Sequence, residues 1–397
     1  MSDKLNFVFA NDESNGGELF HQSALYHYVI NNPNFTKTLN YSLSQSDKNI
    51  FLLECRTSLE DFYKKDSNNK TILDTLPNHI IESIKNNNTK ILLSSIAEAT
   101  EIVPDFFDNL KNELNRFELD ETHLILLDSN QNFLDVSTKF KIFTTLHFIV
   151  ICNYQPNELN DLNYISELPT KEEVLAITKR NKHFICLNRN SQRPHRYYLS
   201  LFFEKYKLYN KSLYSLLLPL HDNNYKKLED LEKYKPFVSK RIPMELDTQN
   251  RLKSLNGFHV GNTFFKEHYL DSYFNITTET CFSEGQIFFT EKIIKPILCL
   301  QPFIILSSPN YLKKLKGLGF KTFDSIWDES YDEIQDNEDR LIKIFNLILK
   351  ISQWSIEECE KNYKSVLDIC IYNREHLSTF WKIDEFSNIL NSIKNEW

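Results

Sequence analysis

The chain has 397 residues, of which 41% are hydrophobic and 25% charged, and its formal net charge is −8. This length exceeds what one hydrophobic core usually supports, so the sequence predicts two domains. The acidic balance argues against a protein that coats nucleic acid through a basic face, although it leaves room for an enzyme acting locally on DNA.

Cysteine usage and the apolar segments indicate the compartment. The seven cysteines are scattered without any CxxC spacing, which is typical of reduced thiols and not of a zinc or disulfide site. No signal-peptide pattern precedes the first apolar run. The most apolar segment, residues 143–152, is far shorter than the ~20 residues that a membrane helix requires. We therefore expect a soluble, cytoplasmic protein without a membrane span.

Short apolar runs alternate with helical patterns in the first part of the chain. The runs predict strands at Leu5–Ala10, Ile50–Cys55, Ile91–Ser95, Leu124–Asp128 and Leu146–Cys152. Helical patterns lie between them at Glu18–Ile30, Leu76–Lys85 and Pro104–Arg116. This alternation predicts a parallel sheet with helices on both faces.

Two loops in this part are candidate ligand loops, because parallel α/β sheets bind ligands at the carboxyl ends of their strands. The loop after the first strand contains Asn15, Gly16 and Gly17 and either lines the acceptor site or is only a flexible connection. The loop after the third predicted strand carries Glu98 and Glu101, either of which can point into the same crevice.

A polar stretch from Asn153 to Lys182 marks the domain boundary, so we predict domains at residues 1–165 and 166–397. The second part repeats the βα rhythm. Its predicted strands lie at His183–Leu187, Tyr214–Leu218, Asn275–Thr280, Pro302–Leu306 and Lys321–Phe323, and its helices at Lys171–Lys179, His195–Lys207 and Tyr311–Leu318. Consecutive helices are expected from Arg340 to Lys394.

The segment Thr290-Glu291-Lys292 places a hydroxyl, a carboxylate and an ammonium at a predicted helix start. Apolar residues then recur at helical spacing, beginning with Ile293 and Ile294. Free backbone N–H groups and the helix dipole favour an anion at such a position. The segment therefore predicts a site for a phosphate-bearing ligand.

A second cationic element, the loop Asn188–Arg196, follows a predicted strand and begins a helix. Its Arg189, Arg193 and Arg196 carry planar guanidinium groups that suit a diphosphate. Lys292 would approach the same crevice, and Glu291 can accept hydrogen bonds from ribose hydroxyls. The competing interpretations are a solvated basic loop and a simple salt bridge to Glu291.

Acidic residues near these elements allow fewer conclusions. Glu279 and Glu284 flank the turn before the helix, and each is either a ligand for sugar hydroxyls or a surface acid. The acidic run from Asp328 to Glu333 lacks EF-hand spacing, so a solvated loop or helix start is favoured and no metal site is predicted. The GxGxxG, GxxxxGK[ST], GxSxG and HExxH motifs are absent, which argues against the common enzymes that carry them.

These residues resemble a known family. The passage from Phe289 to Lys292, with the apolar helix and Gln301–Ile305 after it, is similar to the signature of the α1,3-fucosyltransferase type of glycosyltransferase. The string from Phe288 to Asp332, with Asn188-Arg189 and His195-Arg196, also resembles uncharacterised glycosyltransferase-like proteins of phages and marine bacteria. The resemblance implies a GT-B-like fold, in which two Rossmann-like domains face each other across a cleft, followed here by C-terminal helices.

The resemblance also implies roles for individual residues. Glu291 would contact the nucleotide ribose, Lys292 the phosphates, and an arginine of the Asn188–Arg196 loop would be the second phosphate clamp. The family's inverting mechanism implies a glutamate base in the N-terminal domain, for which we prefer Glu98 to Glu101 and Glu18. Residues 281–284 depart from the fucosyltransferase pattern, so the donor sugar stays open.

The expected function is a metal-independent, inverting glycosyltransferase that needs no cofactor. It would move a sugar from a nucleotide-sugar donor, bound by the C-terminal domain, to a hydroxyl of a glycan or other acceptor. Two alternatives stay open: a phage-type transferase that acts on modified DNA bases, and an inactive GT-B scaffold that binds a glycan or a protein.

Overall fold

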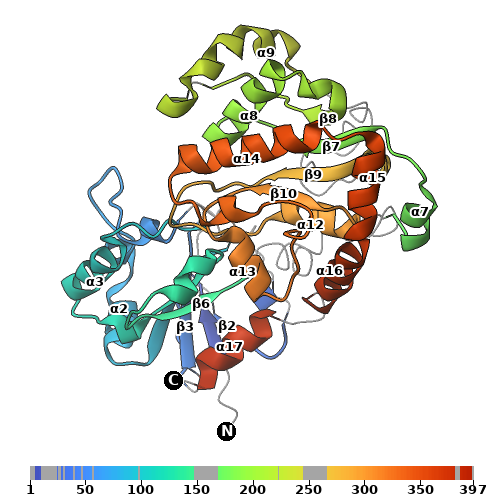
Figure 1. The fold of residues 1–397 in the computed structure, drawn as a ribbon. Coiled ribbons are helices and arrows are strands. Elements are labelled where there is room, and N and C mark those ends of the chain that lie inside the picture. The colour runs from blue at the N-terminus through green and yellow to red at the C-terminus, as the bar shows by residue number, and fades with distance from the viewer. Residues whose placement is uncertain are drawn as a thin grey trace. The chain divides into compact units, whose positions relative to one another are not determined.

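The structure is a computed structural model, which describes residues 5–9, 25, 28–29, 32–38, 41–45, 48–55, 58–96, 99–146, 169–221, 223–244, 266–380 and 385–395. The chain divides into two compact units (Figure 1). Unit 1 comprises Met1–Leu159 and Trp381–Trp397, and unit 2 comprises Asn160–Phe380. The C-terminal segment thus lies with unit 1, whereas the sequence-based division had assigned it to the second domain.

Unit 1 contains a sheet with the strand order β2-β1-β3-β4-β5-β6. Every neighbouring pair in it is parallel. The strands are β1 (Leu5–Val8), β2 (Thr36–Thr38), β3 (Lys48–Glu54), β4 (Thr89–Ser95), β5 (Leu124–Asp128) and β6 (Lys141–Thr144). The predicted parallel α/β fold is confirmed for this unit.

Both faces of the inner strands β1, β3, β4 and β5 are buried, which explains why they read as apolar runs. Phe51 and Leu53 of β3 belong to one core cluster, which also includes residues of α2 (Asn78–Lys85) and α3 (Phe106–Arg116). Ile50 and Leu52 point to the other face and its separate cluster. Four residues of the last helix, α17 (Glu385–Asn395), complete that second cluster: Phe386, Ile389, Leu390 and Ile393.

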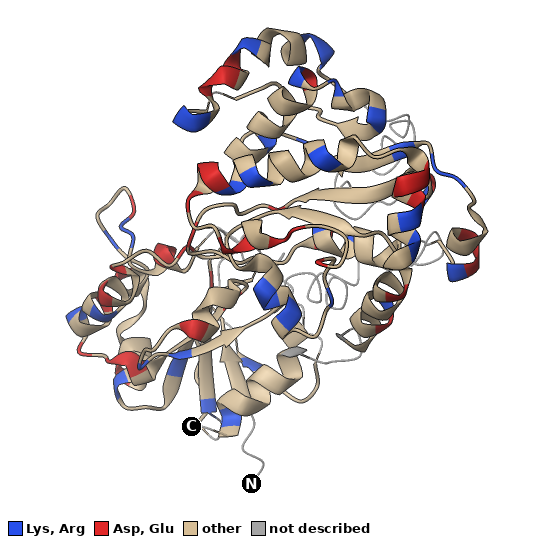
Figure 2. Ribbon diagram, in the orientation of Figure 1, with Lys and Arg blue, Asp and Glu red and all other residues tan. Residues whose placement is uncertain are grey.

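Unit 2 contains a four-stranded sheet with the order β10-β9-β7-β8, and all its pairs are also parallel. Its strands are β7 (Lys182–Leu187), β8 (Ser212–Ser215), β9 (Ser272–Thr278) and β10 (Phe303–Leu306). Strands β9 and β10 carry no charged residue, whereas the helices around them carry both signs (Figure 2). This distribution is expected for strands that are enclosed on both faces.

Helices surround this second sheet. They are α7 (Lys171–Ala176), α8 (Pro194–Lys205), α9 (Lys235–Arg241), α11 (Lys266–Leu270), α12 (Glu291–Leu298), α13 (Tyr311–Gly317), α14 (Asn337–Ser352), α15 (Ile356–Ser365) and α16 (Leu367–Phe380). Helices α8 and α14 pack on each other through the stacked rings of Phe202 and Phe345, whose centroids are 4.4 Å apart. The predicted succession of helices after Arg340 is confirmed.

One strand prediction differs from the structure. Lys321–Phe323 is not a strand, because the Asn373 side chain takes both backbone groups of Lys321: it accepts from the N–H at 2.8 Å and donates to the carbonyl at 2.8 Å. The sixth strand of unit 1 precedes the predicted Leu146–Cys152, most of which lies outside the described residues. Strand β2 was not predicted, because its three residues are polar and at least partly exposed.

Cysteine burial agrees with the sequence-based expectation. The cysteines that the structure describes are Cys55, Cys186, Cys281, Cys299, Cys359 and Cys370, and all are buried and free. Among the described helices, none is long and apolar enough to cross a membrane.

Candidate functional site

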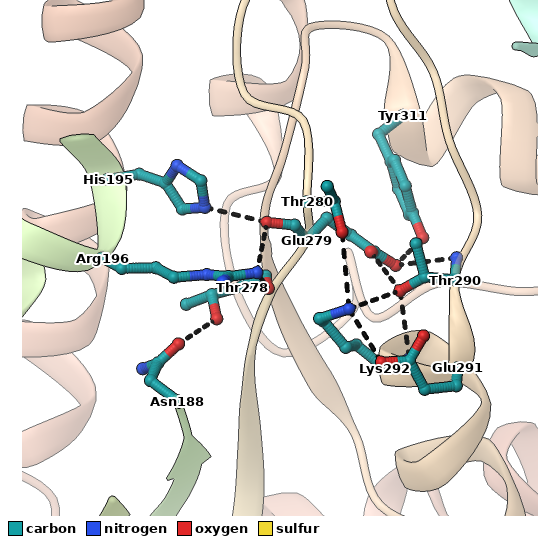
Figure 3. Close-up of polar contacts among 10 residues, drawn as sticks. All are labelled: Asn188, His195, Arg196, Thr278, Glu279, Thr280, Thr290, Glu291, Lys292 and Tyr311. Carbon is teal, nitrogen blue, oxygen red and sulfur yellow. Dashed lines mark hydrogen bonds and ion pairs between the residues drawn. The ribbon is translucent and has the colours of Figure 1, made fainter. Parts of the chain in front are cut away.

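Polar residues gather at the carboxyl edge of the unit 2 sheet, where β7 and β9 end side by side. Asn188 follows β7, and its side-chain oxygen accepts a 2.5 Å hydrogen bond from the hydroxyl of Thr278, the last residue of β9. Figure 3 shows this pair beside the segment from Glu279 to Lys292. The predicted loop Asn188–Arg196 and the predicted helix start therefore do meet at one edge of the sheet.

Glu279 anchors this edge from the inside. Its carboxylate is fully buried and accepts hydrogen bonds from the Tyr311 hydroxyl at 2.7 Å and the Thr290 hydroxyl at 2.6 Å. Burial raises the pKa of Glu279, against the opposing effect of Lys292 and of these hydrogen bonds. The carboxylate is thus neither a surface acid nor open to a ligand, whereas Glu284 is exposed.

Thr290 links the Glu279 carboxylate to the start of helix α12. It is the N-cap of α12, in extended backbone conformation, and its hydroxyl accepts a 3.2 Å hydrogen bond from the backbone N–H of Lys292. Behind the cap, Ile293, Ile294 and Ile297 are buried, so packing holds the helix in place while its first turn faces the sheet edge. The sequence-based prediction of this helix start is confirmed.

Glu291 and Lys292 form a partly exposed ion pair on that first turn. The Lys292 ammonium lies 2.8 Å from the Glu291 carboxylate, 3.2 Å from the Thr290 hydroxyl and 3.4 Å from the Thr280 hydroxyl (Figure 3). Burial by itself would raise the pKa of Glu291, but Lys292 and Lys295 outweigh it and hold the pKa at about 2. Glu291 is therefore anionic at neutral pH and keeps the ammonium at the helix start.

Lys295, one turn further along α12, was not singled out in the sequence. Burial lowers its pKa to about 8, against the stabilising charge of Glu291. The signal that could have identified it is its spacing of four residues from Glu291, which places both side chains on one face of the helix.

The three arginines of the predicted loop take different positions. Arg189 and Arg193 are exposed, and neither guanidinium has a partner within the part of the chain that the structure describes. Arg196 is buried, and its Nη2 donates 3.0 Å hydrogen bonds to the carbonyls of Thr278 and Glu279. The first two can reach a ligand in solution, whereas Arg196 fixes the end of β9 and adds positive charge beneath it.

A buried aromatic and cationic cluster supports this edge; of its members, Arg340 was not singled out in the sequence. The Nε2 atom of His195 lies 2.9 Å from the Glu279 carbonyl oxygen, and the His195 ring stacks on Phe282 with the ring centres 4.7 Å apart. The guanidinium of Arg340 lies 4.4 Å from the centre of the Phe282 ring, and its Nε donates to the Ser307 carbonyl at 3.0 Å. Arg340 sits in an ordinary amphipathic helix pattern, so no local signal distinguishes it.

The candidates of unit 1 are only partly described. Asn15, Gly16, Gly17 and Glu98 lie outside the described residues. Glu101 is exposed and directly follows the buried Thr100.

No group of three or more His, Cys, Asp or Glu side chains suited to a metal ion occurs among the described residues. The acidic run has structural partners instead: Asp332 accepts from the backbone N–H groups of Leu312 and Lys313 at 2.9 and 3.0 Å, and Asp328 pairs with Lys343 at 2.8 Å. Asp332 therefore caps the first turn of α13.

A scan against protein-family models and a search of curated proteins each gave no match. Among solved structures, an α,α-trehalose-phosphate synthase (UDP-forming) from Burkholderia vietnamiensis is similar, with 10% identity, 98% of this chain and 99% of that chain covered, and a TM-score of 0.39.

Two other solved structures are similar at the same level. An O-GlcNAc transferase mutant from Thermobaculum terrenum shows 9% identity, covers 99% of this chain and 68% of its own, and has a TM-score of 0.40. An α1,3-fucosyltransferase with GDP, the type that the Thr290–Lys292 segment resembles, shows 10% identity, 92% and 91% coverage and a TM-score of 0.34. Because the likeness is this slight, function has to be argued from the site.

Proposed function

We propose that the protein is a glycosyltransferase whose unit 2 binds a nucleotide-sugar donor at the carboxyl edge of its sheet. The observation that carries this proposal is the start of α12, where Thr290, Glu291 and Lys292 lie at the same edge as the arginine loop. A helix start with a lysine favours a phosphate group, and the exposed Arg189 and Arg193 supply guanidinium forks for a second one. Glu291 accepts hydrogen bonds from the ribose hydroxyls.

Breaking the donor's glycosyl–phosphate bond requires positive charge near the phosphates. When a glycosyl–phosphate bond breaks, the leaving nucleoside diphosphate gains negative charge that must be stabilised by a metal ion, by fixed cations or by a helix dipole. Lys292, the arginines and the α12 N-terminus supply fixed positive charge, so we propose a metal-independent reaction. We further propose transfer with inversion, in which a glutamate of unit 1, Glu98 or Glu101, receives the proton of the acceptor hydroxyl.

Donor binding is tested by measuring the affinity of UDP, GDP and CMP, and of their sugar conjugates, by calorimetry. Lys292→Ala is expected to weaken binding of the preferred nucleotide roughly 10- to 100-fold, since a hydrogen bond to a charged group contributes about 1.5–3 kcal/mol. Lys350→Ala is the matched control, because Lys350 is an exposed lysine on α14, away from the site. Equal binding by wild type and Lys292→Ala would contradict the donor site.

The remaining parts of the proposal have separate tests. Transfer in the presence of EDTA is expected to equal transfer without it, and loss of activity that Mg²⁺ or Mn²⁺ restores would refute metal independence. The anomeric configuration of the product, read by NMR, decides between inversion and retention. A chain that binds the nucleotide tightly but neither hydrolyses nor transfers the sugar would be a binding scaffold instead of an enzyme.

A further inference from the structure

A buried carboxylate organises the carboxyl edge of the unit 1 sheet. Asp128 is the last residue of β5 and is fully buried. Its two carboxylate oxygens accept the backbone N–H of Thr100 at 3.1 and 3.3 Å, and one of them also accepts the N–H of Asn130 at 2.6 Å.

Every polar group of Thr100 is engaged in this way. Its carbonyl accepts from the Asn130 side chain at 2.7 Å, and its hydroxyl accepts from the backbone N–H of Leu59 at 2.8 Å. The Ser129 hydroxyl holds the other end of the same loop through the Ile96 carbonyl at 2.7 Å. The loop after β4 is therefore fixed at both ends, and Thr100 itself is completely buried.

The same arrangement occurs at the donor edge of unit 2. There, the buried carboxylate of Glu279 accepts the N–H of Thr290 at 3.4 Å and its hydroxyl at 2.6 Å. In both units the threonine is followed by a glutamate that reaches the surface: Glu291 is partly exposed and Glu101 is exposed. In each unit, a buried acid thus holds a threonine through hydrogen bonds, and the glutamate that follows the threonine reaches the surface.

We propose that Asp128 is a positioning residue that, through Thr100, presents Glu101 to an acceptor hydroxyl. The assignment of an acceptor rests on the proposed glycosyltransferase function, whereas the positioning itself does not. Loops at the carboxyl ends of parallel strands are where such sheets bind ligands, and a carboxylate on a fixed backbone is suited to accept a hydroxyl proton. Burial raises the pKa of Asp128 to about 7 against the opposing effect of its hydrogen bonds.

Amide hydrogen exchange tests the positioning directly. Asp128→Ala is expected to speed exchange of the peptide that contains residues 96–101 by at least tenfold, because the Thr100 N–H loses its acceptor. Asp128→Asn keeps one acceptor oxygen and should restore most of the protection. Glu113→Gln is the matched control, since Glu113 is another buried carboxylate of unit 1 bonded to a threonine, Thr71, at 2.5 Å. Unchanged exchange in Asp128→Ala would overturn the proposal.

A double-mutant cycle tests the role of Glu101. With the donor found by calorimetry, and with glucose, N-acetylglucosamine and lactose as acceptor probes, release of the free nucleotide is measured. Glu101→Gln is expected to lower kcat at least roughly 100-fold, the range of a general base, and Asp128→Ala roughly 10-fold, with donor affinity unchanged in both.

The coupling between the two positions decides the outcome. Asp128→Ala should have no further effect on kcat when Glu101 is already glutamine, because the anchor acts through that side chain. Independent, multiplicative losses, or full activity of Glu101→Gln, would overturn the proposal. If the wild type releases no nucleotide from any donor, the proposed function fails, and the exchange experiment still decides whether Asp128 positions the loop.

Discussion

The carboxyl edges of the two sheets are built alike around a buried acid and a threonine, yet they differ in the residues that come after the threonine. In unit 2, Thr290 caps a helix and Lys292 comes two residues later. In unit 1, Glu101 is followed by Ile102, and the next helix, α3, begins only at Phe106. One edge therefore combines a carboxylate with a helix dipole and an ammonium, whereas Glu101 at the other edge stands outside any helix start.

This difference suits the two edges to different ligands. A helix start with a lysine attracts anions, whereas a carboxylate repels them and accepts hydrogen bonds from neutral hydroxyls. The proposed donor phosphates thus belong to unit 2 and the proposed hydroxyl-bearing acceptor to unit 1. Variants at the shared anchor and variants at the groups that distinguish the two edges are expected to behave differently.

The largest effect on stability is expected at the anchor of unit 2. Glu279→Ala would leave the buried hydroxyls of Tyr311 and Thr290 without their acceptor, which is expected to cost about 3–4 kcal/mol of the free energy of unfolding. Urea unfolding followed by circular dichroism measures this loss. Glu279→Gln keeps an acceptor oxygen and should lose less than half as much; equal losses would show that charge, not hydrogen bonding, matters.

The anchor of unit 1, Asp128, should make the free energy of unfolding depend on pH. An aspartate side chain ordinarily has a pKa of 3.8, whereas the pKa of Asp128 in the folded chain is about 7. Between these values the folded state binds more protons than the unfolded state, so its stability falls as pH rises, by about 4 kcal/mol in total. Urea midpoints measured from pH 4 to 8 should therefore decline less in Asp128→Asn than in the wild type. Parallel profiles would contradict the raised pKa.

A smaller loss of stability is expected when Thr290, the helix cap of unit 2, is replaced. Thr290→Val removes both the bond to the Lys292 N–H and the bond to Glu279, and we expect it to cost about 2 kcal/mol. Thr290→Ser retains the hydroxyl and should be within about 0.5 kcal/mol of the wild type in the same urea experiment. A serine variant as unstable as the valine variant would mean that the methyl group, not the cap, is important.

The smallest change in stability is expected where the largest functional change is proposed. Lys292 and Glu291 are 27% and 23% exposed as side chains, and such a pair contributes only about 0–1 kcal/mol to folding. Lys292→Met should therefore unfold at nearly the wild-type urea concentration while nucleotide binding, measured by calorimetry, is strongly weakened. A large loss of stability with intact binding would make this ion pair structural.

Much of unit 2 was predictable because its signals are local. The apolar runs of β7 and β10 and the Thr290 cap before a helical pattern are properties of a few neighbouring residues. Asp128 and Arg340 were missed because their roles depend on partners that lie far away in the sequence. Arg196 was predicted as part of a phosphate clamp, but only the structure showed that its side chain turns inward to the end of β9.

By itself, the sequence determined the alternation of strands and helices and the helix start at Thr290, since periodicity and capping are encoded within one or two turns of chain. Tertiary structure decided which acids are anchors and which are presented. Glu279 and Glu291 are identical in chemistry and twelve residues apart by number, and only packing buries the first against Tyr311 and exposes the second. The same holds for Asp128 and Glu101, because burial depends on the neighbours that folding brings together.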